Sequence, residues 1–119
     1  MYQVHFVRFF LVSNDNPDYI IGTISLSHIN RGSSPSANMG YKIDRLNRGK
    51  GLASLMIAHM LDVVIPDLGI HRTECYIHPD NKISLHLMDK MSFIDEGIAH
   101  SYVKLNGKWQ DHRRFVYIS

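Results

Sequence analysis

The sequence has 119 residues, of which 45% are hydrophobic and 20% charged, and its formal net charge at pH 7 is +2. This length suffices for one domain with a sizeable core and is too short for two, so we expect a single domain over residues 1–119. The weak charge argues against direct nucleic-acid binding, which usually needs a basic stripe, and no apolar run approaches the roughly 20 residues that span a bilayer.

Two further features concern the compartment. Cys75 is the single cysteine, which excludes an internal disulfide and fits a reducing environment. The first residues mix His5 and Arg8 with apolar side chains, a pattern that does not fit a secretory signal peptide. We therefore expect a cytoplasmic location.

The first third of the chain predicts three strands. Val- and Phe-rich residues come first, an alternation of apolar and polar residues follows, and segments of turn-forming residues separate the strands. The predicted order is a strand at 4–12, a turn at 13–18, a strand at 19–29, a loop at 31–38 and a strand at 39–44.

A helix is predicted next, from Leu52 to about Ile65. Apolar residues recur there at helical spacing, and Pro66 and Gly69 are expected to end the helix. The apolar face is assigned to Leu52, Leu55, Met56, Met60 and Val63, broadened by Leu61 and Val64.

The remaining sequence predicts a strand, a second helix and a hairpin. Asn106-Gly107 is the strongest short hairpin signal, and Pro79 ends the strand before the helix. The predicted segments are 72–78, the helix 81–91 with Ile83, Leu87, Met88 and Met91 on one side, and strands at 97–105 and 108–118. The order β-β-β-α-β-α-β-β predicts an α/β fold with a mixed sheet and at least one parallel crossover.

The segment from Arg48 to Ala53, Arg-Gly-Lys-Gly-Leu-Ala, joins the third strand to the first helix. Free backbone N–H groups and the positive end of the helix dipole converge at such a turn, and glycine lets a ligand come close. The spacing matches neither a Walker loop nor a dinucleotide fingerprint. We interpret the segment as a site for a phosphate-bearing molecule, although a short Gly-x-Gly at a helix start is more often structural.

A second segment runs from Asn81 to Phe93. In the simplest interpretation, Asn81 caps the second helix and Phe93 belongs to the core. The two segments together, about thirty residues apart, are more specific than either alone.

These residues resemble the GNAT acetyltransferases. The pattern of Arg48, Gly51 and Ala53 looks like the acetyl-coenzyme A pyrophosphate turn of that superfamily, and the run 81–93 is similar to its next helix. The segments 40–41, 68–74 and 106–112 look like the ribosomal-protein-alanine N-acetyltransferase branch.

The resemblance implies a GNAT fold with acetyl-CoA as co-substrate. Backbone N–H groups of the turn would take the pyrophosphate, main-chain groups near Ile43 would pair with the pantetheine arm, and Lys90 would face the ribose phosphate. The implied cofactor-binding residues are Ile43, Arg45, Arg48, Gly49, Lys50, Gly51, Leu52, Ala53, Asn81 and Lys90.

The implied reaction is direct attack of a primary amine on the acetyl thioester in a ternary complex. Ser84 is the candidate that protonates the departing thiolate, with a helix-surface serine as the alternative, and Glu74 is the first candidate base, with His28 and His100 behind it. An α-amino group has a pKa of about 7.7–8.0, so a peptide N-terminus tolerates a weaker base than a lysine amine does. We therefore expect a protein or peptide N-terminal amine, or a small amine, as acceptor.

The sequence departs from the family pattern at two positions and at its N-terminal part. Met88 stands where many members have a proton-donating tyrosine, and Ser92 replaces a glycine before Phe93. The family also normally begins with a strand and two helices that wall the acceptor site, and this chain starts near the second strand. The acceptor site is then open, closed by a second subunit as in a homodimer, or lost in a fragment.

Two rival functions remain. A truncated, catalytically weak acetyl-CoA-binding module would explain Met88 and the short front, and an RNA- or ribosome-associated protein would explain the slight basicity. We expect no metal site, because the histidines lack zinc-ligand spacing, and we expect Cys75 to be an inert buried thiol. Tyr41, Tyr76 and Trp109 are interpreted as sheet residues with polar tips.

Overall fold

The computed structural model describes residues 4–119 and has the predicted element order. A helix, a π-helical turn and a further helical turn follow one another without a break, so they count as the single first helix of the prediction. No helix in the described residues is long and apolar enough to cross a membrane. The elements are β1 (Val7–Val12), β2 (Ile20–Asn30), β3 (Ser36–Ile43), the 3-10 turn η1 (Arg45–Asn47), α1 (Leu52–His59), the π turn η2 (Met60–Val64), α2 (Ile65–Leu68), β4 (Arg72–Ile77), α3 (Lys82–Lys90), β5 (Ile94–Leu105) and β6 (Lys108–Ile118).

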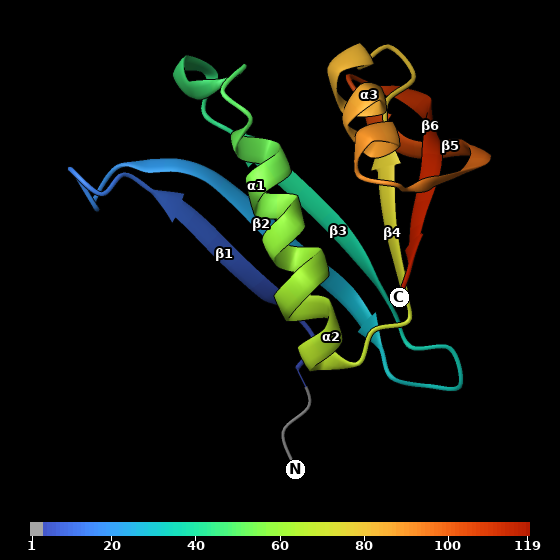
Figure 1. Cartoon of the computed structure of the whole chain (residues 1–119). Coiled ribbons are helices and arrows are strands. Elements are labelled where there is room, and N and C mark those ends of the chain that lie inside the picture. The colour runs from blue at the N-terminus through green and yellow to red at the C-terminus, as the bar shows by residue number, and fades with distance from the viewer. Residues whose placement is uncertain (1–3) are drawn as a thin grey trace.

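The strands of residues 4–119 form one six-stranded sheet in the order β1-β2-β3-β4-β6-β5. Every neighbouring pair is antiparallel except β3 and β4, which are parallel, and this confirms the predicted crossover. The parallel pairing ends at Asn38 and Glu74 after three register pairs, and beyond it the two strands diverge (Figure 1). The sheet is therefore split into two halves, which face each other along the unpaired edges of β3 and β4.

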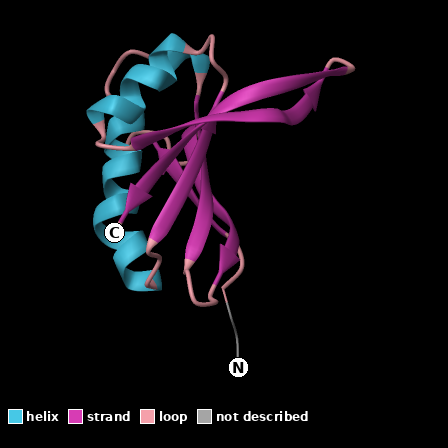
Figure 2. Ribbon diagram, turned by 90° about the vertical axis from the view of Figure 1, so that its right-hand side faces the viewer, coloured by secondary structure: helices cyan, strands magenta, loops and turns pink. Residues whose placement is uncertain are grey.

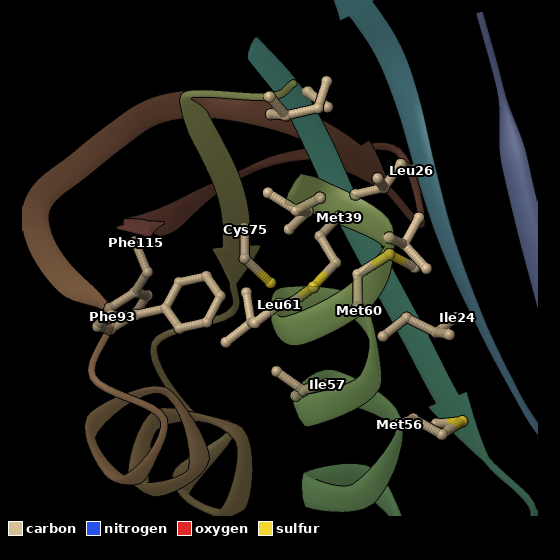
Figure 3. Close-up of a cluster of buried hydrophobic side chains, with 14 of the residues drawn as sticks. Ile24, Leu26, Met39, Met56, Ile57, Met60, Leu61, Cys75, Phe93 and Phe115 are labelled. Atoms are coloured by element: carbon tan, nitrogen blue, oxygen red, sulfur yellow. The ribbon is translucent and has the colours of Figure 1, made fainter. Parts of the chain in front are cut away.

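The helices gather on one side of the sheet, and the other side has no helix within residues 4–119 (Figure 2). The core lies between the helices and the sheet. Leu61, Met39 and Cys75 meet near its centre, and Phe93 and Phe115 pack at the end near α3 (Figure 3). Burial of these apolar side chains fixes α1 and α3 on the same face, one over each half of the sheet.

Pro66 does not end the first helix, contrary to the prediction. Pro66 lies in the first turn of α2, directly after the π turn, and the chain stays helical to Leu68 before Gly69 ends it with a φ of 69°. Directly before Pro66 the backbone N–H of Ile65 donates to the carbonyl oxygen of Met60, five residues earlier, so the hydrogen-bond pattern is wider there than the i−4 pattern that a proline breaks. The wide π turn thus lets the helix pass the proline.

The predicted apolar faces of both helices are partly wrong. Leu55 and Val63 are 59% and 53% exposed, whereas Ile57 and Ile65 are fully buried. Ile83 of α3 is also exposed. Apolar residues surround most of the first helix, so their spacing alone did not identify the side that meets the sheet.

The third strand begins at Ser36, three residues before the predicted start at Met39. Residues 36–38 are those that pair with β4. A partner strand that is distant in sequence therefore extends β3 into a segment whose composition predicted a loop.

Candidate functional site

A cleft lies between the start of α1 and α3, above the part of β3 that has separated from β4. Its volume is about 580 Å³, within the range of small-molecule sites. The lining comes from three segments: 41–43 of β3, residues of 47–54, and residues of α3 and its cap between 81 and 90. Two segments that the sequence singled out, about thirty residues apart, thus meet at one cleft.

The glycine turn has the backbone geometry of an anion site. Gly49 and Gly51 have φ values of 79° and 75°, which side chains other than glycine rarely adopt. A Cβ at either position would meet nothing within 4 Å, so the backbone conformation, and not crowding, requires glycine. Gly51 occupies the N-cap position of α1 and offers no side-chain acceptor, so this helix start is uncapped and the N–H groups of its first turn, at the cleft lining, have no side-chain cap.

Three cationic side chains line the cleft, Lys42, Arg48 and Lys90, and the last two make hydrogen bonds there. Arg48 donates from Nε to the carbonyl oxygen of Ile43 over 3.5 Å, and Lys90 donates from Nζ to Oγ of Ser54 over 3.3 Å. Both contacts are long and exposed, so both side chains are able to exchange them for an anionic ligand. Lys90 reaches from α3 to α1 and joins the two walls of the cleft.

The other two basic residues of the predicted set lie outside the lining. Arg45 belongs to η1 and is exposed. Lys50 donates from Nζ to Oδ1 of Asn47 over 3.3 Å. The remaining residues of the set, including Ile43, Leu52, Ala53 and Asn81, all line the cleft.

A small polar network holds the chain between β3 and the glycine turn. The Tyr19 hydroxyl donates to the Asp44 carboxylate, and Nδ2 of Asn47 lies 3.1 Å from both the Asp44 oxygen and the Tyr19 oxygen. The hydrogen bond from Tyr19 is the main reason why the pKa of Asp44 is lowered. The network connects β2 to the entrance of the cleft.

Asn81 begins α3 as its cap. Its Oδ1 accepts a hydrogen bond from the backbone N–H of Ser84 over 3.1 Å, which confirms the simplest interpretation of this residue. Phe93 is buried in the core, as expected. Ser84 is half-buried and lines the cleft from the first turn of α3.

Tyr41 is the site residue that the sequence analysis assigned to the sheet alone. Its side chain lies on the helix side of β3 and lines the cleft, and burial raises the pKa of its phenol. The nearby Ser84 hydroxyl acts in the opposite direction on that pKa, but no hydrogen bond of normal geometry joins the two groups. Alternation along β3 with Met39 and Ile43 was the signal that pointed to this side of the sheet.

Glu74 does not line the cleft. It alternates with the buried Thr73 and Cys75, so it lies on the sheet face opposite the helices. Its two carboxylate oxygens accept hydrogen bonds from Nε of Arg72, at 3.0 Å, and from the Tyr76 hydroxyl, at 2.7 Å. Arg72 also pairs with Glu96, and together these residues form an ion network on the open face.

The histidines and the cysteine lie apart from the cleft described above, with the exception of His86. His28 contacts Ser27, and His100 lies 3.5 Å from Asp111, both at exposed positions. Within residues 4–119 there is no group of three potential metal ligands. Burial raises the pKa of the Cys75 thiol to about 12, which makes it a poor nucleophile.

Comparison with known proteins identifies similar sequences and folds. Residues 2–94 match the family described as Acetyltransferase (GNAT) domain. The chain is 38% identical over 96 residues to "Probable N-acetyltransferase YjcK" of Bacillus subtilis, covering 81% of this chain and 53% of that protein. It is 29% identical over 103 residues to a spermidine N(1)-acetyltransferase of Vibrio cholerae, covering 87% of this chain and 59% of that protein.

A solved structure shows the same fold. The ribosomal-protein-S5-alanine acetyltransferase from Vibrio fischeri superposes with a TM-score of 0.88 at 30% identity, covering 93% of this chain and 60% of that chain. The present chain therefore spans little more than half the length of the proteins that it matches.

Proposed function

The chain belongs to the GNAT acetyltransferase family, and from this premise we propose that it transfers an acetyl group from acetyl-CoA to a primary amine. The observation that carries the proposal is the cleft itself. An uncapped helix start and the separated edge of a strand line the same cavity. The first feature suits a pyrophosphate, and the second suits the amides of a pantetheine arm.

The residues present fit such a donor. The backbone N–H groups of the turn around Gly49 and Gly51 would hold the pyrophosphate, with Arg48 adding charge from one side and Lys90 from the other. Main-chain groups of residues 41–43 would pair with the pantetheine. Arg45 and Lys50 would contribute from outside the lining, at longer range.

The chemistry requires a base for the amine and a proton donor for the thiolate. Ser84 is our candidate donor, because its hydroxyl lines the cleft. Glu74 stays our candidate base: it lies where the pairing of β3 and β4 ends, on the sheet face opposite the helices, and an amine that entered the split from that face would meet it. Its bonds to Arg72 and Tyr76 occupy both carboxylate oxygens, so one of them would have to loosen.

We propose a protein or peptide N-terminal amine as the acceptor. The Vibrio fischeri neighbour is named for a ribosomal protein alanine, and the Vibrio cholerae relative is named for spermidine. Both acceptors are primary amines, and the N-terminal amine is the one that needs less help from a base. A small amine is the second candidate, and a homodimer through the edge strand β1 remains a prediction.

Two measurements test the proposal. Isothermal titration with acetyl-CoA should show one saturable site, and absence of binding at millimolar ligand would exclude the function. Turnover with an alanine-initiated peptide and with spermidine, followed by release of free thiol, then distinguishes the acceptors. Binding without turnover on any amine would favour the rival function, a coenzyme-binding module.

A further inference from the structure

The hydroxyl of Tyr41 is a buried polar group at the cleft that the protein leaves without a partner. Its oxygen is closed to solvent and makes no hydrogen bond within residues 4–119. Buried hydroxyl groups in folded proteins are nearly always hydrogen-bonded, and an unpaired one needs an explanation. Because Tyr41 lines the cleft, we look for this explanation in the state that has a ligand bound there.

Ser84 is the group through which Tyr41 would act. The Ser84 hydroxyl is close enough to influence the phenol, and it is itself half-buried and lines the cleft. A ligand would therefore meet Ser84 first, with Tyr41 behind it. The neighbouring side chains of α3, Leu87 and Met88, have no proton to give.

The only ionisable side chain from β4 that acts on the phenol within the described residues is Cys75. Burial raises the pKa of that thiol to about 12, so it stays neutral over the working range of an enzyme. Tyr41 and Ser84 thus form a pair of neutral hydroxyl groups at the cleft, in which the oxygen of Tyr41 is the one that is closed to solvent.

We propose that Tyr41 is a positioning residue that supplies a proton, through Ser84, to the sulfur that leaves the thioester donor. This inference rests on the proposed acetyltransferase function. A serine hydroxyl alone gives up its proton far less readily than a phenol, even one such as Tyr41 whose pKa is raised above its ordinary value by burial. A phenol behind the serine makes the serine a better donor, and ligand binding would align the two hydroxyl groups.

The bond between the amine nitrogen and the acetyl carbon forms, the carbon–sulfur bond breaks, and the sulfur keeps the electron pair. The Ser84 proton moves to the sulfur, and the Tyr41 proton moves to the Ser84 oxygen. The amine releases its proton to solvent, and after the thiol leaves, Ser84 passes its proton back to the Tyr41 phenolate and takes one from the solvent in the cleft.

The test is a titration of the CoA thiol in its complex with the protein. CoA labelled with ¹³C at the carbon bonded to sulfur reports the ionisation of the thiol by NMR. We expect the bound thiol to have a pKa about one unit higher in Tyr41→Phe than in wild type, because the thiolate loses part of its hydrogen bonding. Ser84→Ala should raise it at least as much.

The double variant Tyr41→Phe/Ser84→Ala distinguishes a relay from two separate effects. If Tyr41 acts through Ser84, the double variant titrates like Ser84→Ala alone. Additive shifts, or a thiol pKa unchanged in Tyr41→Phe, would overturn the inference while leaving the proposed function intact. Tyr102→Phe, an exposed tyrosine of β5, is the matched control and should titrate like wild type. Failure of the wild type to bind CoA would overturn both proposals.

Discussion

The helices α1 and α3 begin at the same cleft and treat their first N–H groups in opposite ways. Asn81 caps α3 with its own side chain, through a 3.1 Å hydrogen bond to the N–H of Ser84. Gly51 caps α1 in a left-handed conformation and offers no side-chain acceptor. One helix start is satisfied by the protein, and the other is left for a ligand. The contrast supports the proposal that the α1 wall of the cleft binds the anion and that the α3 wall supplies side chains for chemistry.

The largest expected effect comes from filling the uncapped start. We expect Gly51→Trp to weaken acetyl-CoA binding at least about a hundredfold, because a large side chain would occupy the cleft and the φ of 75° would be strained. Isothermal titration measures this. Gly69→Trp is the matched control, since Gly69 has a φ of 69° and open space around it but lies outside the cleft lining. Equal loss of binding in both variants would contradict the assignment.

Reversing one charge at the same wall should have the next largest effect. We expect Arg48→Glu to weaken acetyl-CoA binding about tenfold to a hundredfold, the range for losing a hydrogen bond to a charged group. Arg45→Glu makes the same change of charge three residues earlier, outside the cleft lining. Binding constants at two salt concentrations would compare them. A larger loss of acetyl-CoA affinity in Arg45→Glu than in Arg48→Glu would indicate that the anion site lies nearer to η1.

The capped start should respond through stability. Asn81→Ala removes the cap of α3 and should lower the free energy of unfolding by about 1 kcal/mol, measured in urea. Asn81→Asp keeps an acceptor oxygen and should retain most of that stability. If Asn81→Asp nevertheless loses acetyl-CoA affinity, the amide nitrogen of Asn81 contacts the donor, as the family resemblance implies. Unchanged affinity would limit the role of Asn81 to capping.

The smallest expected effect concerns the network that leads to the uncapped start. The pKa of Asp44 is lower in the folded chain than in the unfolded chain, mainly through Tyr19, so its carboxylate favours folding above about pH 4. That contribution is lost as the pH falls through the folded pKa. Tyr19→Phe should move the Asp44 pKa upward, toward its ordinary value. If a carboxyl titration by NMR shows the same Asp44 pKa in Tyr19→Phe as in wild type, Tyr19 does not belong to the network that leads to the glycine turn.

Local chemistry in the sequence predicted most of the fold. The Asn106-Gly107 hairpin, the glycine turn and the Asn81 cap depend on neighbouring residues, and the structure has the hairpin and the cap where they were predicted. The first helix was predicted less well. Its side that meets the sheet is decided by packing against strands distant in sequence, which is why Leu55 and Val63 were assigned to the wrong face.

The site was predicted unevenly for the same reason. The segments at Arg48 and Asn81 carry recognisable spacing, and both line the cleft. Tyr41 has no motif of its own, because the feature that distinguishes it is a hydroxyl that folding buries at the cleft and leaves unpaired. Glu74, the proposed base, is bonded to Arg72 and Tyr76 outside the cleft lining, and no local pattern in the sequence links these residues to the cleft.

The ladder between β3 and β4, with three register pairs, is the shortest in the sheet of residues 4–119. A molecule in the cleft would contact β3 and α1 on one half of the sheet and α3 on the other. It would therefore stabilise the two halves relative to each other. By linkage, a ligand at a hundred times its Kd adds about 2.7 kcal/mol to the stability of the folded chain. The fraction of folded protein would then increase with the concentration of the molecule bound in the cleft, because that molecule joins the two halves of the split sheet.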